Sequence, residues 1–307
     1  MSKPLVILGV FVADAAYRAP RQPRIGETIL GLDFKLGPGG KGSNQSVAAG
    51  RLGADVSFIT RLGTDDFARM ANEIWAEAGV KPAIIETPES YTGSAFIFLE
   101  EATGNNAIII APGAAALLSP ADIEKNRALI EGAGVFITQL EQPVDAARHA
   151  LEIARAAGVT TILNPAPAAS LPDEIFTLCD YLTPNESEAE ELTGIEVRTV
   201  DDARRAADAL LAKGVGTVIV TLGEKGALLH SRDGSEHLPV VSAGPVKETT
   251  GAGDAFNAGF ATALARGDTP SNAVRFATAV AGISVTRAGA ALSMPTLQEV
   301  EALLARN

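Results

Sequence analysis

The sequence contains only one cysteine, one tryptophan and three histidines in 307 residues. The lone Cys179 can form no internal disulfide and cannot anchor a cysteine-based zinc cluster, which excludes the disulfide-stapled secreted class. The histidines His149, His230 and His237 are scattered without metal-ligand spacing. This composition is typical of a reducing compartment, so we expect a cytoplasmic protein.

Basic residues are also scarce. Lys and Arg number 25 against 37 Asp and Glu, which gives a formal net charge of −12. Nucleic acid would require a basic face, so we expect no nucleic-acid partner. Small anionic ligands stay open, because a few backbone amides can create a local positive site on an acidic protein.

The N-terminal apolar run Leu5–Ala13 is too short to span a bilayer and is closed by Asp14. It favours a buried first strand over a signal peptide, and we expect no membrane association. Hydrophobic residues make up 47% of the chain and charged residues 20%, which excludes disorder as the main state. Because repeats and low-complexity linkers are absent, we expect one large domain over residues 1–307.

Short apolar runs alternate with alanine-rich helical patterns through most of the chain. Continuous apolar strands separated by helices are typical of parallel strands buried on both faces, so the sequence predicts an α/β fold with a doubly wound, mainly parallel sheet. The expected strands are Leu5–Val12, Val56–Arg61, Gly134–Gln139, Thr160–Leu163, Tyr181–Thr183, Thr217–Thr221 and Ala227–His230, and the expected helices include Ser43–Leu52, Asp65–Glu77, Pro120–Glu131, Val144–Ala157 and Val200–Lys213.

Two segments depart from this alternation. Gly26–Leu36 and Thr92–Ile110 alternate apolar and polar residues with no helix between strands, and residues 103–106 predict a hairpin turn. We expect a small antiparallel β lid from residues 14–36 and 92–110. Such a sheet has one exposed face, which would cover a substrate or a second copy of the chain. The alternative is an extension that only pads the sheet edge.

A glycine-rich loop, residues 37–45, follows a predicted strand and opens a helix. Gly37, Gly39 and Gly42 fit the dinucleotide pattern G-x-G-x-x-G, but the strand before them is not the first of the sheet, and the acidic residue expected about 20 residues later is missing. The loop is not a P-loop, since Lys41 is followed by glycine. Its polar residues Lys41, Asn44 and Gln45 suit a polyol better than a pyrophosphate; a purely structural tight turn is the alternative.

A second glycine-rich segment, Glu248–Phe256, leads into an alanine-rich helix. Gly251, Ala252 and Gly253 would expose successive amides at a helix N-terminus, which is an anion-binding arrangement. Asp254 lies in the first turn, where a carboxylate could take a proton from an alcohol attacking a phosphorus atom. An ordinary capped helix is the alternative.

Both segments resemble the signatures of the ribokinase family of sugar kinases, the PfkB-type carbohydrate kinases. The stretch GGKGSNQSVAAGRLG (39–53) is similar to the N-terminal signature and ETTGAGDAFNAG (248–259) to the C-terminal one; NPAPA (164–168) and TPNESE (183–188) match as well. The resemblance covers essentially the whole chain in the right order. Within the family, the sugar loop and NPAPA are most similar to members that act on ribose.

The resemblance implies an ATP-dependent sugar kinase that forms ribose 5-phosphate, uses Mg²⁺ and K⁺, and forms a homodimer through the lid. Asp254 would be the base and Gly251, Ala252 and Gly253 the anion hole. The implied sugar ligands are Asp14, Gly39, Gly40, Lys41, Asn44, Glu141 and Asp254. Asn185, Glu188, Thr221, Gly223, Gly226 and Gly253 would lie at the nucleotide and its magnesium, and Glu248, Thr250, Arg287, Gly289 and Ser293 would serve the monovalent cation.

Two positions depart from the family pattern. Val12 stands where many members carry Asn, which would cost one hydrogen bond to a sugar hydroxyl, worth about 0.5–1.5 kcal/mol. Glu248 replaces the usual Asp. A kinase for another sugar, a sugar acid or a nucleoside therefore stays open, as do the more distant alternatives of an NAD-dependent dehydrogenase and a non-catalytic sugar-binding protein.

Overall fold

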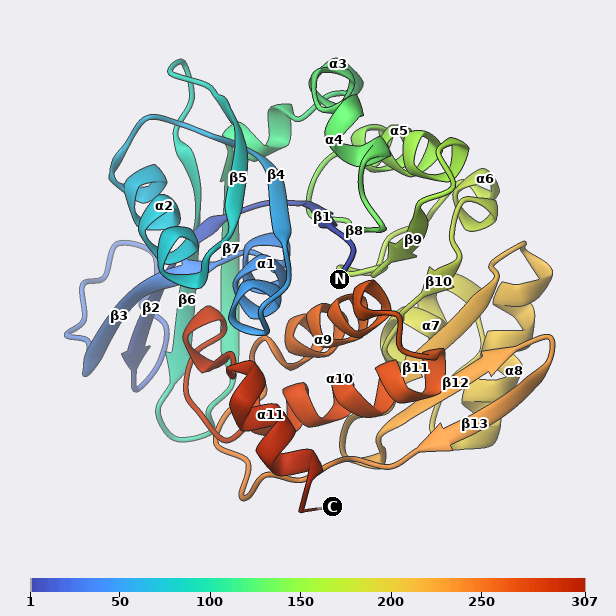
Figure 1. Cartoon of the computed structure of the whole chain (residues 1–307). Coiled ribbons are helices and arrows are strands. Elements are labelled where there is room, and N and C mark those ends of the chain that lie inside the picture. The colour runs from blue at the N-terminus through green and yellow to red at the C-terminus, as the bar shows by residue number, and fades with distance from the viewer. Residues whose placement is uncertain (1, 307) are drawn as a thin grey trace.

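The computed structural model describes residues 2–306, and within them nine strands form one twisted sheet (Figure 1). The strands follow one another across the sheet as β13 (Gly234–Leu238), β12 (Ala227–Ser231), β11 (Thr217–Thr221), β10 (Tyr181–Leu182), β9 (Thr160–Leu163), β8 (Val135–Thr138), β1 (Leu5–Leu8), β4 (Val56–Leu62) and β5 (Lys81–Glu86). All neighbours from β5 to β11 pair in parallel, and only the β11–β12–β13 edge is antiparallel. This confirms the predicted α/β fold.

Helices cover both faces of this sheet, which is why the parallel strands are continuously apolar. Leu5 and Ile7 of β1 pack into one core, while Val6 and Leu8 pack into the other. The first core is closed by α1 (Lys41–Arg51), α2 (Asp66–Ala78), α9 (Ala252–Arg266), α10 (Pro270–Ser284) and α11 (Leu297–Leu304). The second is closed by α3 (Pro120–Lys125), α4 (Arg127–Glu131), α5 (Val144–Ala156), α6 (Asp173–Thr177), α7 (Glu186–Thr193) and α8 (Val200–Ala212).

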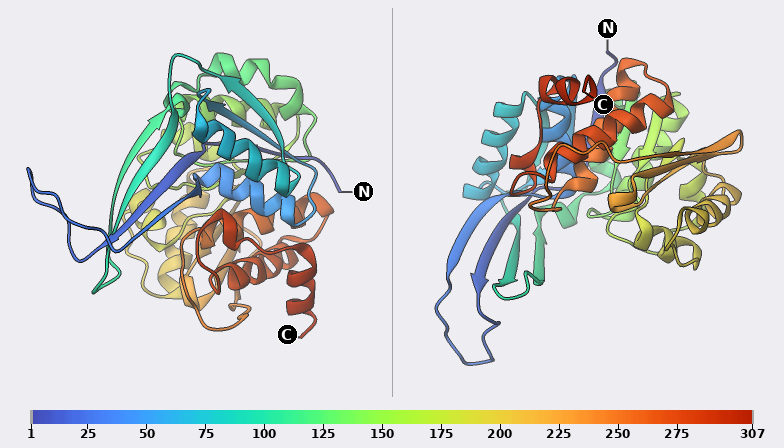
Figure 2. Two further views of the ribbon diagram at one scale, coloured as in Figure 1. Left: turned by 90° about the vertical axis from the view of Figure 1, so that its left-hand side faces the viewer. Right: turned by 90° about the horizontal axis from the view of Figure 1, so that it is seen from below.

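A second, smaller sheet projects from the body beside β4 and β5 (Figure 2). Its strands lie in the order β3 (Asp33–Gly39), β2 (Val12–Ala19), β6 (Thr92–Glu100) and β7 (Asn106–Gly113). Two features of this sheet match the prediction: its separation from the main sheet and its β6–β7 hairpin. One pairing is different, because β2 and β6 run parallel.

The predicted boundaries of the first strand and of the lid were wrong. The run Leu5–Val12 ends as a strand at Leu8, and Val12 already begins β2, so one apolar run supplies strands to two sheets. The chain bends at Gly9, where a Cβ atom would lie 2.7 Å from the Gly42 Cα and 2.4 Å from the Gln139 side chain. The lid consequently uses residues 12–39 and 92–113, and the predicted strand Gly26–Leu36 is displaced to Asp33–Gly39.

The predicted helix Pro120–Glu131 is divided at Asn126 into α3 and α4. The other expected helices occur within one or two residues of their predicted bounds. The assignment of all residues to a single domain stays a prediction.

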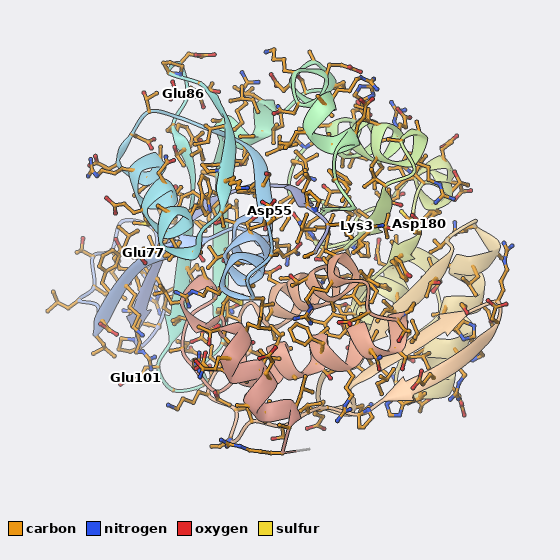
Figure 3. The ribbon with its side chains drawn as sticks, viewed as in Figure 1. Lys3, Asp55, Glu77, Glu86, Glu101 and Asp180 are labelled. Atoms are coloured by element: carbon orange, nitrogen blue, oxygen red, sulfur yellow. The ribbon has the colours of Figure 1, made fainter. Side chains whose placement is uncertain are left out.

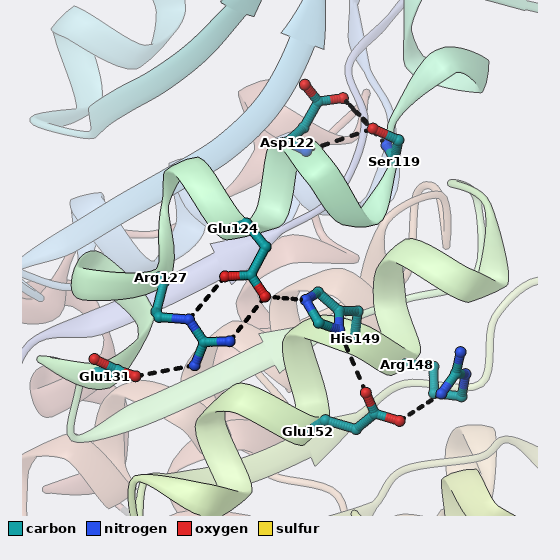
Figure 4. A network of polar contacts seen from close by, with 8 residues as sticks. All are labelled: Ser119, Asp122, Glu124, Arg127, Glu131, Arg148, His149 and Glu152. Carbon is teal, nitrogen blue, oxygen red and sulfur yellow. Dashed lines mark hydrogen bonds and ion pairs between the residues drawn. The ribbon is translucent and has the colours of Figure 1, made fainter.

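Polar side chains tie the helices to one another and to the sheet. Asp180, labelled in Figure 3, accepts the Thr161 backbone N–H at 3.0 Å and pairs with Arg155 of α5. Figure 4 shows a chain of contacts between α3–α4 and α5, in which the Glu124 carboxylate contacts both Arg127 at 2.8 Å and His149 at 2.6 Å. His149 thus has a structural place between two helices.

Candidate active site

The N-termini of α1 and α9 meet beside the carboxyl ends of the parallel strands. Each helix begins after a glycine in the left-handed region, Gly40 with φ 87° and Gly251 with φ 76°. A Cβ atom on Gly40 would lie 2.6 Å from the Val10 carbonyl oxygen, and one on Gly251 would lie 3.1 Å from the Ala290 Cα. Only glycine allows these close approaches, so the two glycine-rich segments bring both helix starts to the same place.

A cavity of about 220 Å³ lies at this junction. Among its lining residues are seven that the sequence singled out: Lys41, Asn185, Glu188, Thr221, Gly251, Gly253 and Asp254. Segments separated by more than 200 residues therefore contribute to one site.

Asp254 lies in the first turn of α9 and is only 5% exposed. Asn44 Nδ2 donates to its Oδ2 at 2.9 Å, and Gln45 Nε2 donates to its Oδ1 at 3.2 Å. Burial raises the pKa of Asp254, and the Lys41 ammonium and the two amide donors partly offset this effect. A desolvated carboxylate with a raised pKa is suited to accept a proton from an alcohol.

Two further carboxyl groups stand near Lys41. The Lys41 backbone N–H donates to Glu141 Oε2 at 2.7 Å. Burial raises the pKa of Glu141 to about 7, and burial together with the Asp254 charge raises the pKa of Asp14 to about 6. Burial alone would lower the pKa of Lys41, but the carboxyl groups around it outweigh burial and raise that pKa. The result is a cluster of polar groups rich in hydrogen-bond acceptors, which suits a polyhydroxylated ligand; Lys41 lines the cavity, whereas Asp14 and Glu141 do not belong to its wall.

Gly39 ends β3 and Gly40 lies between β3 and α1, both next to β2, and neither belongs to the cavity wall. A Cβ atom on Gly39 would lie 2.2 Å from Asp14 Oδ2, so the missing side chain makes room for the carboxylate. Asp14 and Gly37 pair across β2 and β3.

The start of α9 can hold an anion. The Ala252 N–H donates to the Thr249 carbonyl at 3.1 Å, whereas among the described residues no partner is found for the Gly253 N–H. The amide of Ala252 is therefore engaged in the turn, and Gly253 offers the open donor. It adds to the positive end of the helix dipole.

Asn185 and Glu188 form a capping box at the start of α7. The Glu188 N–H donates to Asn185 Oδ1 at 2.8 Å, and the Asn185 N–H donates to Glu188 Oε2 at 2.9 Å. Glu188 is 8% exposed, lines the cavity and has a pKa raised by burial. One carboxylate lining the cavity fits Mg²⁺, which keeps several waters and binds through one or two carboxylates plus phosphate oxygens.

Not every expected residue lines the cavity. Gly223 begins a short 3₁₀ turn after β11, and Gly226, which ends that turn, packs against the backbone of Leu238 and Pro239; neither belongs to the cavity wall. Thr221 reaches the cavity and is joined to Asn185 by a parallel β-bridge.

The residues expected at a monovalent cation lie in two adjacent loops. The Gly289 N–H donates to Glu248 Oε2 at 3.0 Å, and Ser293 Oγ donates to the Ala290 carbonyl at 2.8 Å. Thr250 immediately precedes Gly251, which contacts Ala290. Arg287 pairs with Glu299 of α11. Within residues 2–306, no group of three or more His, Cys, Asp or Glu side chains could hold a metal ion.

Several residues of the site were not identified as such from the sequence. Thr183, Thr249 and Asn257 line the cavity, as do Asn164 and Ala166 from the NPAPA stretch. Gln45 was expected to face a polyol but is fully buried behind Asp254. No local pattern distinguishes a buried amide side chain from an exposed one, whereas the Asn-Pro stretch itself carried a usable signal.

Comparison with known proteins agrees with this geometry. The model of the pfkB family carbohydrate kinases matches residues 3–297. The chain is 41% identical to a ribokinase of Haemophilus influenzae over 97% of each chain, and 36% identical to a deoxyribokinase of Salmonella typhi over 99% of each. The solved structure of Arabidopsis thaliana ribokinase complexed with ribose and ATP matches with a TM-score of 0.95 and 32% identity, over 99% of both chains.

A ribokinase of Thermotoga maritima matches with a TM-score of 0.90 and 36% identity over 99% of both chains. The family match spans nearly the whole sequence, and the sequence signatures that suggested it form one cavity. The chain therefore belongs to the pfkB family of carbohydrate kinases.

Proposed function

We propose that this carbohydrate kinase transfers the γ-phosphoryl group of ATP to the 5-hydroxyl of D-ribose. The observation that carries the proposal is the buried Asp254 carboxylate, which lies at the open N-terminus of α9 and is bonded to Asn44 of the glycine-rich loop. Relatives named ribokinase at 41% and 38% identity, and the solved ribokinase complex with ribose and ATP, favour these two substrates.

In the proposed reaction, Asp254 takes the proton of the sugar hydroxyl as its oxygen forms a bond to the γ-phosphorus and the bond to ADP breaks. The amide of Gly253, with that of Gly251 and the dipole of α9, stabilises negative charge on the transferred group. Asp14, Asn44 and Glu141 hold sugar hydroxyls, and the Lys41 ammonium balances the carboxylates around it. These groups supply alignment and charge neutralisation, which are the main demands of phosphoryl transfer.

Glu188 and Asn185 would hold Mg²⁺ on the nucleotide phosphates. The magnesium ion would neutralise phosphate charge when bound, which an acidic protein needs in order to bind ATP. The loops at Glu248–Thr250 and Arg287–Ser293 would hold K⁺, and their adjacency through Gly251 and Ala290 supports this placement. Thr221, with Gly223 and Gly226 in the following turn, would border the nucleotide.

A second candidate substrate is 2-deoxy-D-ribose. Val12 lies two residues from Asp14 on β2, so both side chains point to the same face of the lid, and Val12 is buried and apolar. An apolar residue beside the sugar ligands suits a sugar with one hydroxyl fewer, and a relative named deoxyribokinase is 36% identical.

The lid would also form a homodimer contact. The Tyr17 ring is tilted against the rings of Phe34 and Phe96, with ring centroids 4.7 and 5.7 Å away, and all three residues are at least 40% exposed. An exposed aromatic cluster of this kind marks an interaction surface. Light scattering should give the mass of a dimer for the unchanged protein and of a monomer for Phe34→Glu. If the unchanged protein is already a monomer, the proposed lid contact is wrong.

The proposed location of this protein is the cytoplasm, because the proposed reaction uses ATP as the phosphoryl donor and because Cys179 is a buried free thiol. Within residues 2–306, none of the helices has the length and apolar character that crossing a membrane requires.

The proposed activity is tested by ADP release with ATP and Mg²⁺ across a panel of sugars and nucleosides, with and without K⁺. Turnover highest on D-ribose supports the first substrate, and turnover highest on 2-deoxyribose supports the second. Turnover confined to a nucleoside or sugar acid would contradict both proposed substrates but support the kinase activity. No turnover on any compound would contradict the activity.

A further inference from the structure

A buried network of amide side chains lies directly behind the base. Gln45 is fully buried and donates a hydrogen bond to the Asp254 carboxylate. Its Nε2 group donates both to Asp254 Oδ1 at 3.2 Å and to Asn164 Oδ1 at 3.3 Å. Its Oε1 atom accepts from Gln139 Nε2 at 2.5 Å.

These three partners fix the orientation of the Gln45 amide. If the amide were reversed, its oxygen would face the oxygens of Asp254 and Asn164, and its nitrogen would face the nitrogen of Gln139. The network continues beyond Asn164, whose Nδ2 donates to the Thr183 carbonyl at 3.2 Å. Thr183 Oγ1 donates to Asn257 Oδ1 at 2.6 Å, and Asn257 Nδ2 donates to the Gly253 carbonyl at 2.9 Å. Residues of α1 and α9, together with the residues that directly follow β8, β9 and β10, thus hold the base and the anion hole in one arrangement.

We propose that Gln45 is a positioning residue, held by Gln139, that keeps the Asp254 carboxylate ionised and oriented toward the sugar hydroxyl. This inference rests on the proposed kinase function. Gln45 itself is too deeply buried to touch a substrate, so its effect passes through Asp254.

The charged groups around Asp254 explain why the hydrogen bond from the Gln45 amide affects the pKa of this carboxyl group. Burial disfavours the ionised form of Asp254 and the Lys41 ammonium favours it. The Asp254 charge in turn contributes, after burial, to the raised pKa values of Asp14, Glu141 and Glu188. Among residues 2–306, the side chains that donate hydrogen bonds to Asp254 are Asn44 and Gln45. Loss of one donor therefore raises the pKa of Asp254 further, because the hydrogen bond stabilises the ionised form.

The test is the pH profile of kcat for Gln45→Met, which removes the amide at nearly constant length. The acid limb should move upward by roughly one to two pH units, the range expected for a lost hydrogen bond to a charged group. On the acid limb, activity at a given pH should fall about tenfold or more, and it should return toward that of the unchanged enzyme on the alkaline side of the profile. KM for the sugar should change little.

Gln142→Met is the matched control. Gln142 is also a buried amide, 3% exposed, and donates to Thr138 Oγ1 at 2.7 Å and to the Gln139 carbonyl at 2.6 Å, with no hydrogen bond to Asp254. It should lower stability without moving the profile. If both variants lower kcat equally at every pH, or if the Gln45→Met profile is unshifted, the inference is wrong.

Two further measurements keep the inference testable in other circumstances. If Gln45→Met does not fold, Gln139→Met leaves the donor in place but frees its orientation, and it should give a smaller shift in the same direction; no shift would overturn the proposal. A ¹³C titration of the Asp254 carboxyl, assigned by its loss in Asp254→Asn, needs no turnover. The titration should show a higher pKa of Asp254 in Gln45→Met than in the unchanged protein, even if the unchanged protein phosphorylates no sugar and the proposed function fails. An unchanged pKa contradicts the inference.

Discussion

Asn44 Nδ2 and Asp254 Oδ2 lie 2.9 Å apart, although 210 residues separate them in the chain. This hydrogen bond joins the first turn of α1 to the first turn of α9, and hence the loop assigned to the sugar to the helix assigned to the phosphoryl group. Each glycine-rich segment alone is compatible with an ordinary turn. Their meeting at one buried carboxylate supports the proposal that they form one catalytic site.

Gly39→Ala should impair sugar binding by displacing Asp14. The added Cβ atom would lie 2.2 Å from Asp14 Oδ2, which forces the carboxylate out of its place. Loss of a charge-assisted hydrogen bond predicts a fall of about 10–100-fold in kcat/KM for the sugar. Gly37→Ala is the control, because its Cβ atom would meet nothing within 4 Å and its φ is not positive. Equal effects of the two substitutions would contradict this explanation.

Gly253→Ala should strongly slow phosphoryl transfer without harming the fold. A Cβ atom at this position meets nothing within 4 Å, and alanine favours the first turn of a helix by up to about 1 kcal/mol relative to glycine. The methyl group would nevertheless stand in the cavity beside the open amide, so kcat should fall by about 10²–10³. Steady-state kinetics and the melting temperature separate the two effects. Undiminished kcat would show that the phosphoryl group binds elsewhere.

Val12→Asn should strengthen binding of the more hydroxylated sugar. The new amide would face the pocket beside Asp14 and gain a hydrogen bond of about 0.5–1.5 kcal/mol, which lowers KM for D-ribose by about 2–10-fold. KM values for ribose and 2-deoxyribose are to be compared with those of Val12→Ala, which removes apolar surface without adding a donor. If KM for both sugars stays constant or rises, Val12 does not border the sugar.

Sugar binding should weaken as the pH falls below neutrality. The pKa values of Glu141, about 7, and Asp14, about 6, place their protonation in the range from pH 8 to 5, and a protonated carboxyl group loses its strength as an acceptor. Below pH 6, KM for the sugar should rise by about tenfold per pH unit for each group that must be ionised. Glu141→Gln should remove the part of this dependence that begins near pH 7.

The stability of the sugar-free protein should change in the opposite direction. Carboxyl groups whose pKa is raised by folding bind more protons in the folded state than in the unfolded chain between about pH 4 and 7. Ionisation of Asp14 and Glu141 lowers the free energy of unfolding as the pH rises through 6 and 7. The melting temperature should therefore increase as the pH is lowered from 8 to 5. A melting temperature that falls over this range would show that other groups dominate.

The sequence was sufficient for the parts of the fold that depend on local patterns. Strands buried on both faces are continuously apolar, so β1, β4, β8, β9 and β11 were predictable. The lid strand β2 was not recognised as separate, because it continues the apolar run of β1 and only the packing of Gly9 against Gly42 divides them. The edge strand β5 was missed since its ends carry Lys81 and Glu86 and give no continuous apolar run.

In the site too, features set by a few adjacent residues could be predicted, whereas features set by three-dimensional packing could not. Helix starts marked by glycine, together with Asp254, could be predicted because their chemistry follows from a few adjacent residues. Glu141 came from the family resemblance alone, and its bond to the Lys41 amide depends on the packing of residues 100 positions apart. Gln45 and Gln139 gain their importance only from three-dimensional neighbours, which no local pattern encodes.

The most direct test of the account compares the unchanged protein with Asp254→Asn. Each is incubated with ATP, Mg²⁺ and D-ribose, and products are followed by phosphorus NMR. The account predicts ribose 5-phosphate and ADP in equal amounts from the unchanged protein, and a rate lower by about 10²–10⁴-fold in the variant, with sugar binding largely retained. Equal rates in the two proteins would contradict the central role of Asp254.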